Sequence, residues 1–311
     1  MPESSLPNST ERLAHARHQS RQGELFASGM IVAESWFPIA AAMAVMALGG
    51  LHAYFYSLLF AALGLSLWWL ARKEYVDLKK TQAYKDLALT SFFITLLFGL
   101  TFVGLQYTSP INVAIILFLQ VLFSYLFLGR KQGESLNARQ LFGGVLMTLG
   151  ALLVLFPGKI QLSLGDFLVL LASMVAPIAN LYQKRARQHV SSATVLLVRS
   201  VIALPFIYLL ALAFEASPSW QMVYAQIWPL LFVGLVVFFL AKVLWIEAIH
   251  RLPITKVNAL FAFSPLLTML WSWWFLEQHP LWFQVAGVVP ILMGALLISS
   301  LTPSKKANKK A

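Results

Sequence analysis

The chain has 311 residues, of which 59% are hydrophobic and 11% are charged, and its mean hydropathy is +0.74. Soluble domains carry about 25% charged residues, so this composition excludes a water-soluble protein and predicts a lipid bilayer as the solvent. The formal charge of +11 lies in short basic runs between long apolar segments, which excludes a nucleic-acid-binding face. The chain has no cysteine, hence no disulfide, and we expect no metal and no cofactor.

In chain order, the predicted elements are a polar segment, ten membrane spans and a basic tail. We expect residues 1–30 to form a disordered cytosolic tail and residues 302–311 to form a second, lysine-rich one. A span needs about 20 mostly apolar residues. This criterion places the spans at 32–50, 52–71, 86–106, 110–128, 139–157, 165–183, 194–214, 227–249, 254–276 and 282–301.

The positions of Lys and Arg test this arrangement independently, because short cytosolic loops are enriched in both. All but three of the 23 Lys and Arg residues fall on the side of the membrane that holds the N-terminus. The exceptions are Lys159, Arg199 and Lys242. Arg199 lies near the cytosolic end of its span, where we expect its side chain to reach the interface. The pattern therefore predicts a cell-membrane protein with cytosolic N- and C-termini.

An internal repeat relates the two halves of the chain. Residues 99–154 align with residues 243–298 at a constant offset of 144, and Gly143 and Gly150 fall on Gly287 and Gly294. The offset carries the third span onto the eighth, so each repeat holds five spans and the second copy enters the membrane from the opposite side. We therefore predict an all-α integral membrane fold of ten transmembrane helices in two inverted-topology repeats, 31–158 and 159–301. Close helix packing is the favoured role of the glycines.

Further motifs stand within the spans and at their ends. They are Leu105–Ala114, Ala248–Pro253, Ser264–Leu267 and Phe275–Glu277. Together with the glycine block, they resemble the drug/metabolite transporter superfamily, specifically its EamA-type ten-helix permeases, over about residues 30–301. At the position where this family usually has a proline in the fourth span, this chain has Val121. The resemblance implies a central cavity near the midplane and alternating-access transport of a small metabolite, and the family includes amino-acid exporters.

Lys242 is the most informative single residue, because it lies about two-thirds of the way along the eighth span. A lysine at such a depth costs roughly 2.5–3.5 kcal/mol on insertion scales and normally faces a cavity or a partner. With Trp245 one turn away, it is predicted to bind an anionic or carboxylate-bearing substrate, or to titrate during transport. The alternative is a structural pair or a side chain that reaches the inner interface. Farther along, Glu247 and Arg251 are four residues apart and are predicted to pair.

Five more polar residues are candidates for the substrate site. Gln120 and Ser264 occupy equivalent mid-span positions in the two repeats, as a site between inverted repeats requires. Helix–helix hydrogen bonding is the alternative for both. Asn112 and Asn258 lie near opposite ends of the fourth and ninth spans and are candidate gate residues. Asn180, near the inner end of the sixth span, belongs with them.

The leading functional hypothesis is a secondary transporter that exports a small metabolite, amino-acid-like or anionic. No Walker-type Gly-Lys-Ser/Thr loop is present, so ATP does not drive it directly. The alternatives are an integral-membrane enzyme acting on a lipid or isoprenoid substrate, and a non-transporting helper protein. The six histidines are scattered and no Asp-rich motif is present, so we expect no catalytic residue. The expected partners are a small-molecule substrate and the bilayer, while substrate identity, direction, ion coupling and the choice between monomer and homodimer stay open.

Overall fold

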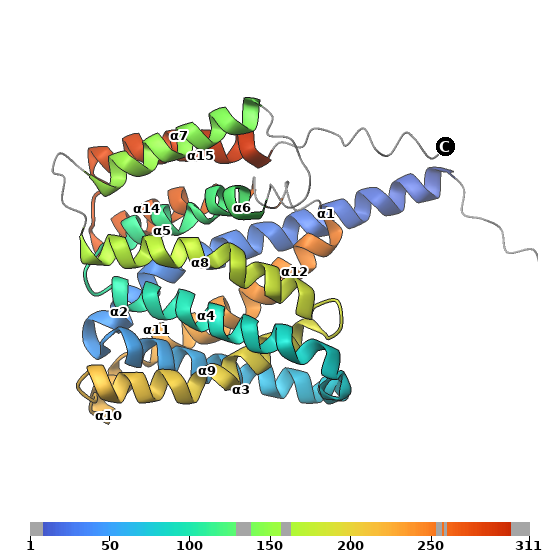
Figure 1. The fold of residues 1–311 in the computed structure, drawn as a ribbon, viewed down its shortest axis with the longest axis horizontal. Helices are drawn as coiled ribbons and strands as arrows, with labels where there is room; N and C mark the ends of the chain where they lie inside the picture. Colours follow the sequence, from blue (N-terminus) through green and yellow to red (C-terminus); the bar gives the residue numbers. More distant parts are fainter. Residues whose placement is uncertain (1–8, 129–137, 157–162, 253–256, 258–259, 300–311) are drawn as a thin grey trace, which may run out of the picture.

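A computed structural model of the chain describes residues 9–128, 138–156, 163–252, 257 and 260–299. All regular elements in these ranges are helices, and they run side by side along the long axis of the molecule (Figure 1). Eight stretches of the described residues are long and apolar enough to cross a membrane, and α15 (Trp282–Ser299) is a shorter apolar helix. The all-helical membrane fold predicted from the sequence is therefore confirmed.

The membrane helices occupy the predicted spans in order. They are α1 (Ser9–Ser35) with α2 (Phe37–Leu48), α3 (Gly50–Ala71), α4 (Tyr84–Gly104), α5 (Pro110–Phe118) with α6 (Gln120–Leu128), α7 (Ala138–Leu155), α8 (Leu164–Ala186), α9 (Ser192–Phe214), α11 (Ile227–Leu231) with the π-helix η4 (Phe232–Ala241) and α12 (Lys242–Arg251), α14 (Ser264–Leu276) and α15. Between them lie the short elements η1 (Glu74–Lys79), η2 (Thr81–Ala83) and α10 (Trp220–Ala225). The first part of the ninth predicted span falls largely outside the described residues.

The predicted disordered tail at residues 1–30 is wrong from Ser9 onward, because α1 begins there and continues into the bundle (Figure 1). Ala27 and Met30 are 0% and 1% exposed and pack in a cluster with Leu252. The apolar stretch of the first span therefore starts earlier than predicted. The charges of the preceding turns hid this start, because they lower the hydropathy of any window that includes them.

Glycines on the fifth and tenth spans bring the two repeats into direct contact. An added Cβ at Gly150 of α7 would lie 2.5 Å from the carbonyl oxygen of Gly287 on α15, and one at Gly143 would lie 2.7 Å from that of Gly294. Residue numbers rise along one helix while they fall along the other, so the two helices are antiparallel. Each glycine meets the repeat equivalent of its neighbour, as a two-fold axis between the helices requires. The inverted relation of the repeats is thus visible in one helix pair.

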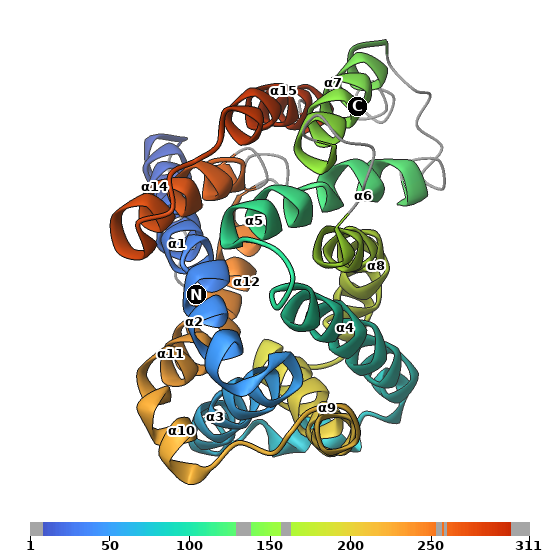
Figure 2. The same cartoon turned by 90° about the vertical axis from the view of Figure 1, so that its left-hand side faces the viewer.

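The second and seventh spans, which are also repeat equivalents, pack in the same antiparallel way. Trp69 Nε1 of α3 donates a hydrogen bond to Thr194 Oγ1 of α9 (2.9 Å), and the ring centroids of Phe55 and Tyr208 are 5.0 Å apart nearer the other end. Viewed down the helices, α7 and α15 lie together at one edge of the bundle, and α3 and α9 lie together at the opposite edge (Figure 2). The other membrane helices therefore lie between these two pairs, and each pair contains one helix from each half of the chain.

Polar side chains accept hydrogen bonds from backbone N–H groups at the starts of helices, because these groups lack acceptors within the helix. At one end of the bundle, which we call the Asp166 end, Ser163 Oγ accepts from the Asp166 N–H (3.0 Å) and caps α8. At the opposite end, the Asp77 end, Ser191 Oγ accepts from the Thr194 N–H (3.2 Å) and caps α9.

At the Asp166 end, one carboxylate joins three helices. Glu215, which follows α9, accepts from the backbone N–H groups of Leu51 (2.9 Å) and His52 (3.0 Å) at the start of α3. It also accepts from Gln106 Nε2 beyond α4 (2.8 Å). The preceding Gly49 has φ +86°, a conformation that favours glycine, and its neighbour is this carboxylate.

We predict that Gly150→Ala destabilises the protein, because the new methyl group would collide with the backbone of α15. Overpacking of this kind typically costs about 1–3 kcal/mol, so the apparent melting temperature in detergent should fall. The matched control is Gly99→Ala in α4, where an added Cβ has no heavy atom within 4 Å. The control should melt like the parent or slightly higher, since alanine favours helix over glycine. Parent-like melting of both variants would contradict the glycine contact.

Candidate functional site

Lys242 lies at the point where the eighth span changes its helical geometry. It is the first residue of α12 and directly follows the π-helix η4. Wider π turns leave the backbone hydrogen bonds irregular and are frequent at functional sites. Lys242 Nζ donates to Glu34 Oε1 of α1 at 2.5 Å, and the two side chains are 21% and 12% exposed. The lysine selected from the sequence is therefore half of a mostly buried ion pair.

Glu34 lies where the first span is interrupted. Trp36 separates α1 from α2, and Pro38 has no N–H to bond the carbonyl oxygen of Glu34 four residues earlier. Thr268 Oγ1 of α14 donates to the carbonyl oxygen of Ser35 (2.7 Å) and so satisfies the neighbouring backbone group. The ion pair thus joins irregular segments of two spans, one from each repeat.

The pair lies close to the two-fold axis of the repeats. Lys242 Nζ is 5.8 Å from the centroid of the Phe98 ring on α4. Phe98 is the repeat equivalent of Lys242, since the offset is 144. Two residues that a two-fold axis interchanges contact each other only near that axis. The Phe98 ring also packs against Phe238 of η4, with centroids 4.7 Å apart, so the lysine rests on an aromatic surface.

A second cation lies in the same interior. Arg199 of α9 is only 5% exposed, and its Nη1 donates to Gln183 Oε1 of α8 (2.8 Å). Leu196, one turn before Arg199 on α9, packs in one cluster with Ile246 of α12, the helix that begins with Lys242. The prediction that Arg199 reaches the interface is therefore wrong, because α9 begins two turns earlier and α8 covers the guanidinium. Glu34 is not among the site residues predicted from the sequence, although its charge in an apolar stretch is a usable signal.

Asn112, predicted as a gate residue, belongs to a network at the Asp166 end. Its Nδ2 donates to Asp166 Oδ1 (3.1 Å), an oxygen that also accepts from Thr108 Oγ1 (2.5 Å). Gln284 Nε2 of α15 donates to Asn112 Oδ1 (2.6 Å). The network connects α5 and α8 with α15 and so ties the first repeat to the second at this end.

The structure disperses the other predicted site residues. Trp245 lies on α12 and packs on Phe261, with ring centroids 6.3 Å apart. Ser264 is buried at the start of α14, and Gln120 is half-buried at the break between α5 and α6. Asn180 is exposed on α8. Asn258 lies outside the described residues.

The predicted pair of Glu247 and Arg251 is confirmed. Arg251 Nη1 donates to the Glu247 carboxylate and to the Glu247 carbonyl oxygen (3.1 Å). Its guanidinium also lies over the Phe26 ring, 4.9 Å from the centroid. These contacts tie α12 to α1 closer to the Asp77 end than the Glu34–Lys242 pair.

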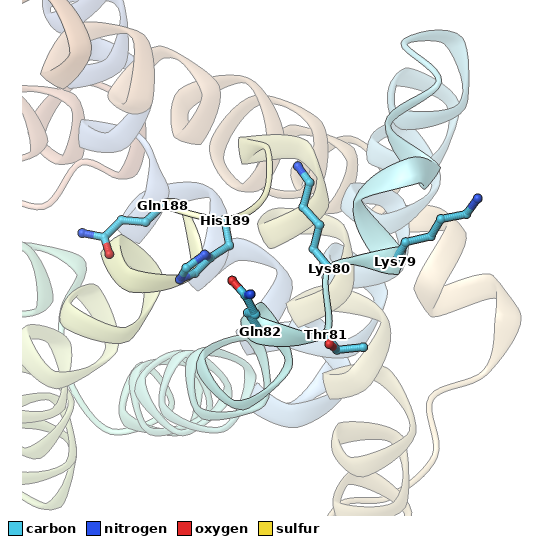
Figure 3. Close-up of a pocket in the computed structure, with 6 residues that line it drawn as sticks. All are labelled: Lys79, Lys80, Thr81, Gln82, Gln188 and His189. Atoms are coloured by element: carbon cyan, nitrogen blue, oxygen red, sulfur yellow. The ribbon is translucent and has the colours of Figure 1, made fainter.

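A separate hollow of about 310 Å³ lies at the Asp77 end (Figure 3). Figure 3 shows its polar lining, which comes from the η1–η2 segment and from the loop after α8: Lys79, Lys80, Thr81, Gln82, Gln188 and His189. No residue predicted for the substrate site lines it. In the described part of the chain, no group of three or more His, Asp and Glu side chains is arranged to hold a metal ion.

Comparison with known proteins identifies the family. Both halves of the chain match the EamA-like transporter family, over residues 21–156 and 163–300. The chain belongs to the EamA-like transporter family. It is therefore a multi-pass membrane protein with a general role in transport, and the resemblance inferred from its motifs is confirmed.

Relatives of this EamA-like transporter carry similar descriptions. The uncharacterized transporter YoaV of Bacillus subtilis is 26% identical over 72% of this chain and 77% of its own length, and YyaM of the same species is 26% identical over 68% and 72%. A probable 4-amino-4-deoxy-L-arabinose-phosphoundecaprenol flippase subunit, ArnF of Klebsiella pneumoniae, is 37% identical over 70 residues, covering 22% of this chain and 56% of ArnF. One crystal structure, 16% identical, superposes with a TM-score of 0.66 over 88% of this chain and 95% of that one, which shows the fold alone.

We predict that Asp77 stabilises this EamA-like transporter in a pH-dependent way. Burial raises the pKa of Asp77, but hydrogen bonds from Lys80, Ser191 and Thr194 outweigh it and hold the pKa below its usual 3.8. Because the folded-state pKa is depressed, the stabilisation is fully present above about pH 4 and is lost as the pH falls through the folded-state value. Asp77→Asn should therefore lower the free energy of unfolding by about 1–3 kcal/mol at pH 7.

The measurement is thermal unfolding of the parent and Asp77→Asn between pH 7 and pH 3. Their difference should shrink below about pH 4, where the parent carboxylate also loses its charge. A difference that stays constant over the whole range would show that the carboxylate charge has no part in it.

We predict strong energetic coupling between Glu34 and Lys242. Each single variant, Glu34→Gln or Lys242→Met, leaves one charge buried without its partner, which typically costs about 3–5 kcal/mol. The double variant removes both charges and should recover much of that loss. Unfolding of all four proteins in detergent measures the coupling. Additive losses in the double variant would contradict the ion pair.

Proposed function

We propose that this EamA-like transporter is a secondary transporter that exports a small metabolite, amino-acid-like or anionic, by alternating access about the Glu34–Lys242 pair. The observation that carries the proposal is the position of this pair. It joins the irregular segment of one span from each repeat, close to the two-fold axis that relates them. Transporters built from inverted repeats bind their substrates at such interrupted helices near the repeat interface.

The bonds at the two ends of the bundle support alternating access. At the Asp166 end, Asn112 binds Gln284 across the repeats. At the Asp77 end, Asp77 accepts from the Ser191 N–H (2.7 Å) and from Thr194 Oγ1 (3.0 Å), which ties the segment after α3 to α9. A path toward either side requires one of these sets to break while the other holds. The positive-inside pattern makes the Asp77 end cytosolic, with both termini on that side of the cell membrane.

The chemistry around Lys242 supports a substrate that carries a carboxylate. An ammonium group forms short, charge-assisted hydrogen bonds with carboxylates, which makes it a suitable anchor in a site that excludes water. Phe98 of α4 lies against Lys242, and Trp245 follows one turn later on α12, so both rings offer flat apolar surfaces to which a side chain of the substrate can bind. These features favour an amino acid or a related small acid over a cation.

A second candidate function is the movement of a lipid-linked substrate. It is favoured by the similarity to ArnF, which is named as a probable subunit of a flippase for an undecaprenol-linked sugar. Such a substrate keeps its hydrocarbon chain in the bilayer and passes only its polar head through the protein. Extraction of lipids as well as water-soluble metabolites distinguishes the two candidates.

We predict that expression of the protein shifts at least one small acid from cells to medium, and that Lys242→Met abolishes the shift. The loss follows because the variant removes the proposed anchor for the carboxylate. The measurement is untargeted profiling of metabolites and lipids in cells and medium. Lys184→Met is the matched control, since Lys184 is exposed in the last turn of α8, away from the pair.

Lys184→Met should export like the parent, provided that all variants are present in the membrane at equal amounts. If the parent protein moves no small molecule, the transport proposal fails. If Lys242→Met exports as well as the parent, the proposed site fails instead.

A further inference from the structure

Between the Asp166 end and the Asp77 end, the buried charges of the described residues do not balance. Glu34, Lys242 and Arg199 lie between the two ends, and together they carry two positive charges and one negative charge. A net charge buried among membrane helices is costly unless a partner arrives. A single carboxylate group brings the sum to zero. The imbalance therefore has the sign and size that one substrate carboxylate corrects.

We propose that Glu34 is an internal stand-in for the substrate's carboxylate, which occupies Lys242 in the empty transporter and moves to Arg199 when the substrate binds. This inference rests on the proposed function and names the ligand chemistry of the same site. The side chain of Glu34 ends in the same carboxylate group as the proposed substrate. Glu34 and Lys242 are 12% and 21% exposed, so the pair is not fully buried.

The guanidinium of Arg199 has hydrogen-bond donors that can bind the carboxylate of Glu34. Its guanidinium has five N–H donors, and its one recorded hydrogen bond within the described residues is to the neutral amide of Gln183. Among the described residues, no carboxylate forms an ion pair with Arg199. Leu196 of α9 packs in one cluster with Ile246 of α12, so the helices that carry Arg199 and Lys242 are in contact. Glu34 therefore has a second cation within the same interior.

The other elements that pack on α1 offer Glu34 no third partner. On α12, Glu247 and Arg251 bind each other nearer the Asp77 end. On α14, the groups that bind the Ser35 segment are the uncharged Thr268 and Trp271. Among the described residues, the exchange is therefore confined to Lys242 and Arg199.

The stand-in explains how the empty transporter can return. Without Glu34, Lys242 of the empty transporter would remain an unpaired ammonium while the helices move. An unpaired charge is unfavourable inside a membrane. With Glu34 in place, the empty and loaded states both present a paired lysine to the moving helices. The cost is a weaker affinity for substrate, because every ligand must displace an internal competitor.

The experiment uses acetate as the probe, since it reproduces the end of the missing side chain. Full-length Glu34→Ala in detergent is heated in increasing sodium acetate at constant ionic strength, with acetamide and methylammonium chloride as neutral and cationic controls. Acetate should raise its melting temperature, because a ligand that binds only the folded state stabilises it. The half-maximal acetate concentration should be at least about tenfold lower than for the parent. Glu34→Ala combined with Lys242→Met should show no acetate response.

Arg199 is tested in the background that retains Glu34. Arg199→Gln should raise the half-maximal acetate concentration at least about tenfold above that of the parent, because the displaced carboxylate loses its second cation. Arg199→Lys keeps the charge and should respond like the parent. If Glu34→Ala does not fold, Glu34→Gln replaces it, with the same expected order of affinities.

Three results overturn the proposal. They are equal stabilisation by acetate and acetamide, an undiminished acetate response without Lys242, and stabilisation of the parent by methylammonium that disappears in Glu34→Ala. The last would make Glu34 a binding site for cations. A failure of metabolite export together with the expected acetate pattern would reject the proposed function and keep the stand-in, so the two failures are distinguishable.

Discussion

The ion pair between Glu34 and Lys242 constrains the rest of the bundle, because a lysine at that depth needs a partner that no neighbour on its own helix supplies. The partner comes from α1, 208 residues earlier in the chain. To bring the two groups together, α1 must pack against α12, and α14 must satisfy the backbone at Ser35. One electrostatic requirement thus brings spans of both repeats to the same point.

Close packing of the repeats supports this centre from both sides. Gly143 and Gly150 let α7 approach the backbone of α15, while α3 and α9 form the second pair that joins the halves. At each end of the bundle, hydrogen bonds join elements of the two halves, such as Asn112 to Gln284 and Asp77 to Ser191. The α7–α15 and α3–α9 pairs hold the halves together at the edges, while a hydrogen bond such as Asn112 to Gln284 can break as the halves rock about a shared centre.

The sequence predicts what depends on local spacing or on repeated residues. The glycine register of the two repeats is visible as an offset, and the Glu247–Arg251 pair follows from four-residue spacing on one helix. Lys242 is conspicuous because its surroundings are apolar. Each of these signals lies within a single helix or in an alignment of two.

The parts that sequence reading missed depend on contacts between distant segments. Glu34 was overlooked because polar turns before it hid the true start of the first span. Arg199 looked like an interfacial residue, because one-dimensional position does not reveal that α8 covers it. Likewise, nothing local indicates that Asn112 binds both Asp166 and Gln284. Tertiary packing decides the environment of each, and the environment decides its chemistry.

Alternating access requires that the Glu34–Lys242 centre be reached in turn from both sides of the membrane. The chain has no cysteine, so Lys242→Cys introduces a single thiol, and Phe92→Cys on the exposed face of α4 serves as a lipid-facing control. The decisive measurement is labelling of both variants by a membrane-impermeant methanethiosulfonate, in right-side-out and inverted vesicles. The account predicts labelling of position 242 in both vesicle types and of position 92 in neither. Labelling of position 242 from one side only, or from neither side, would contradict it.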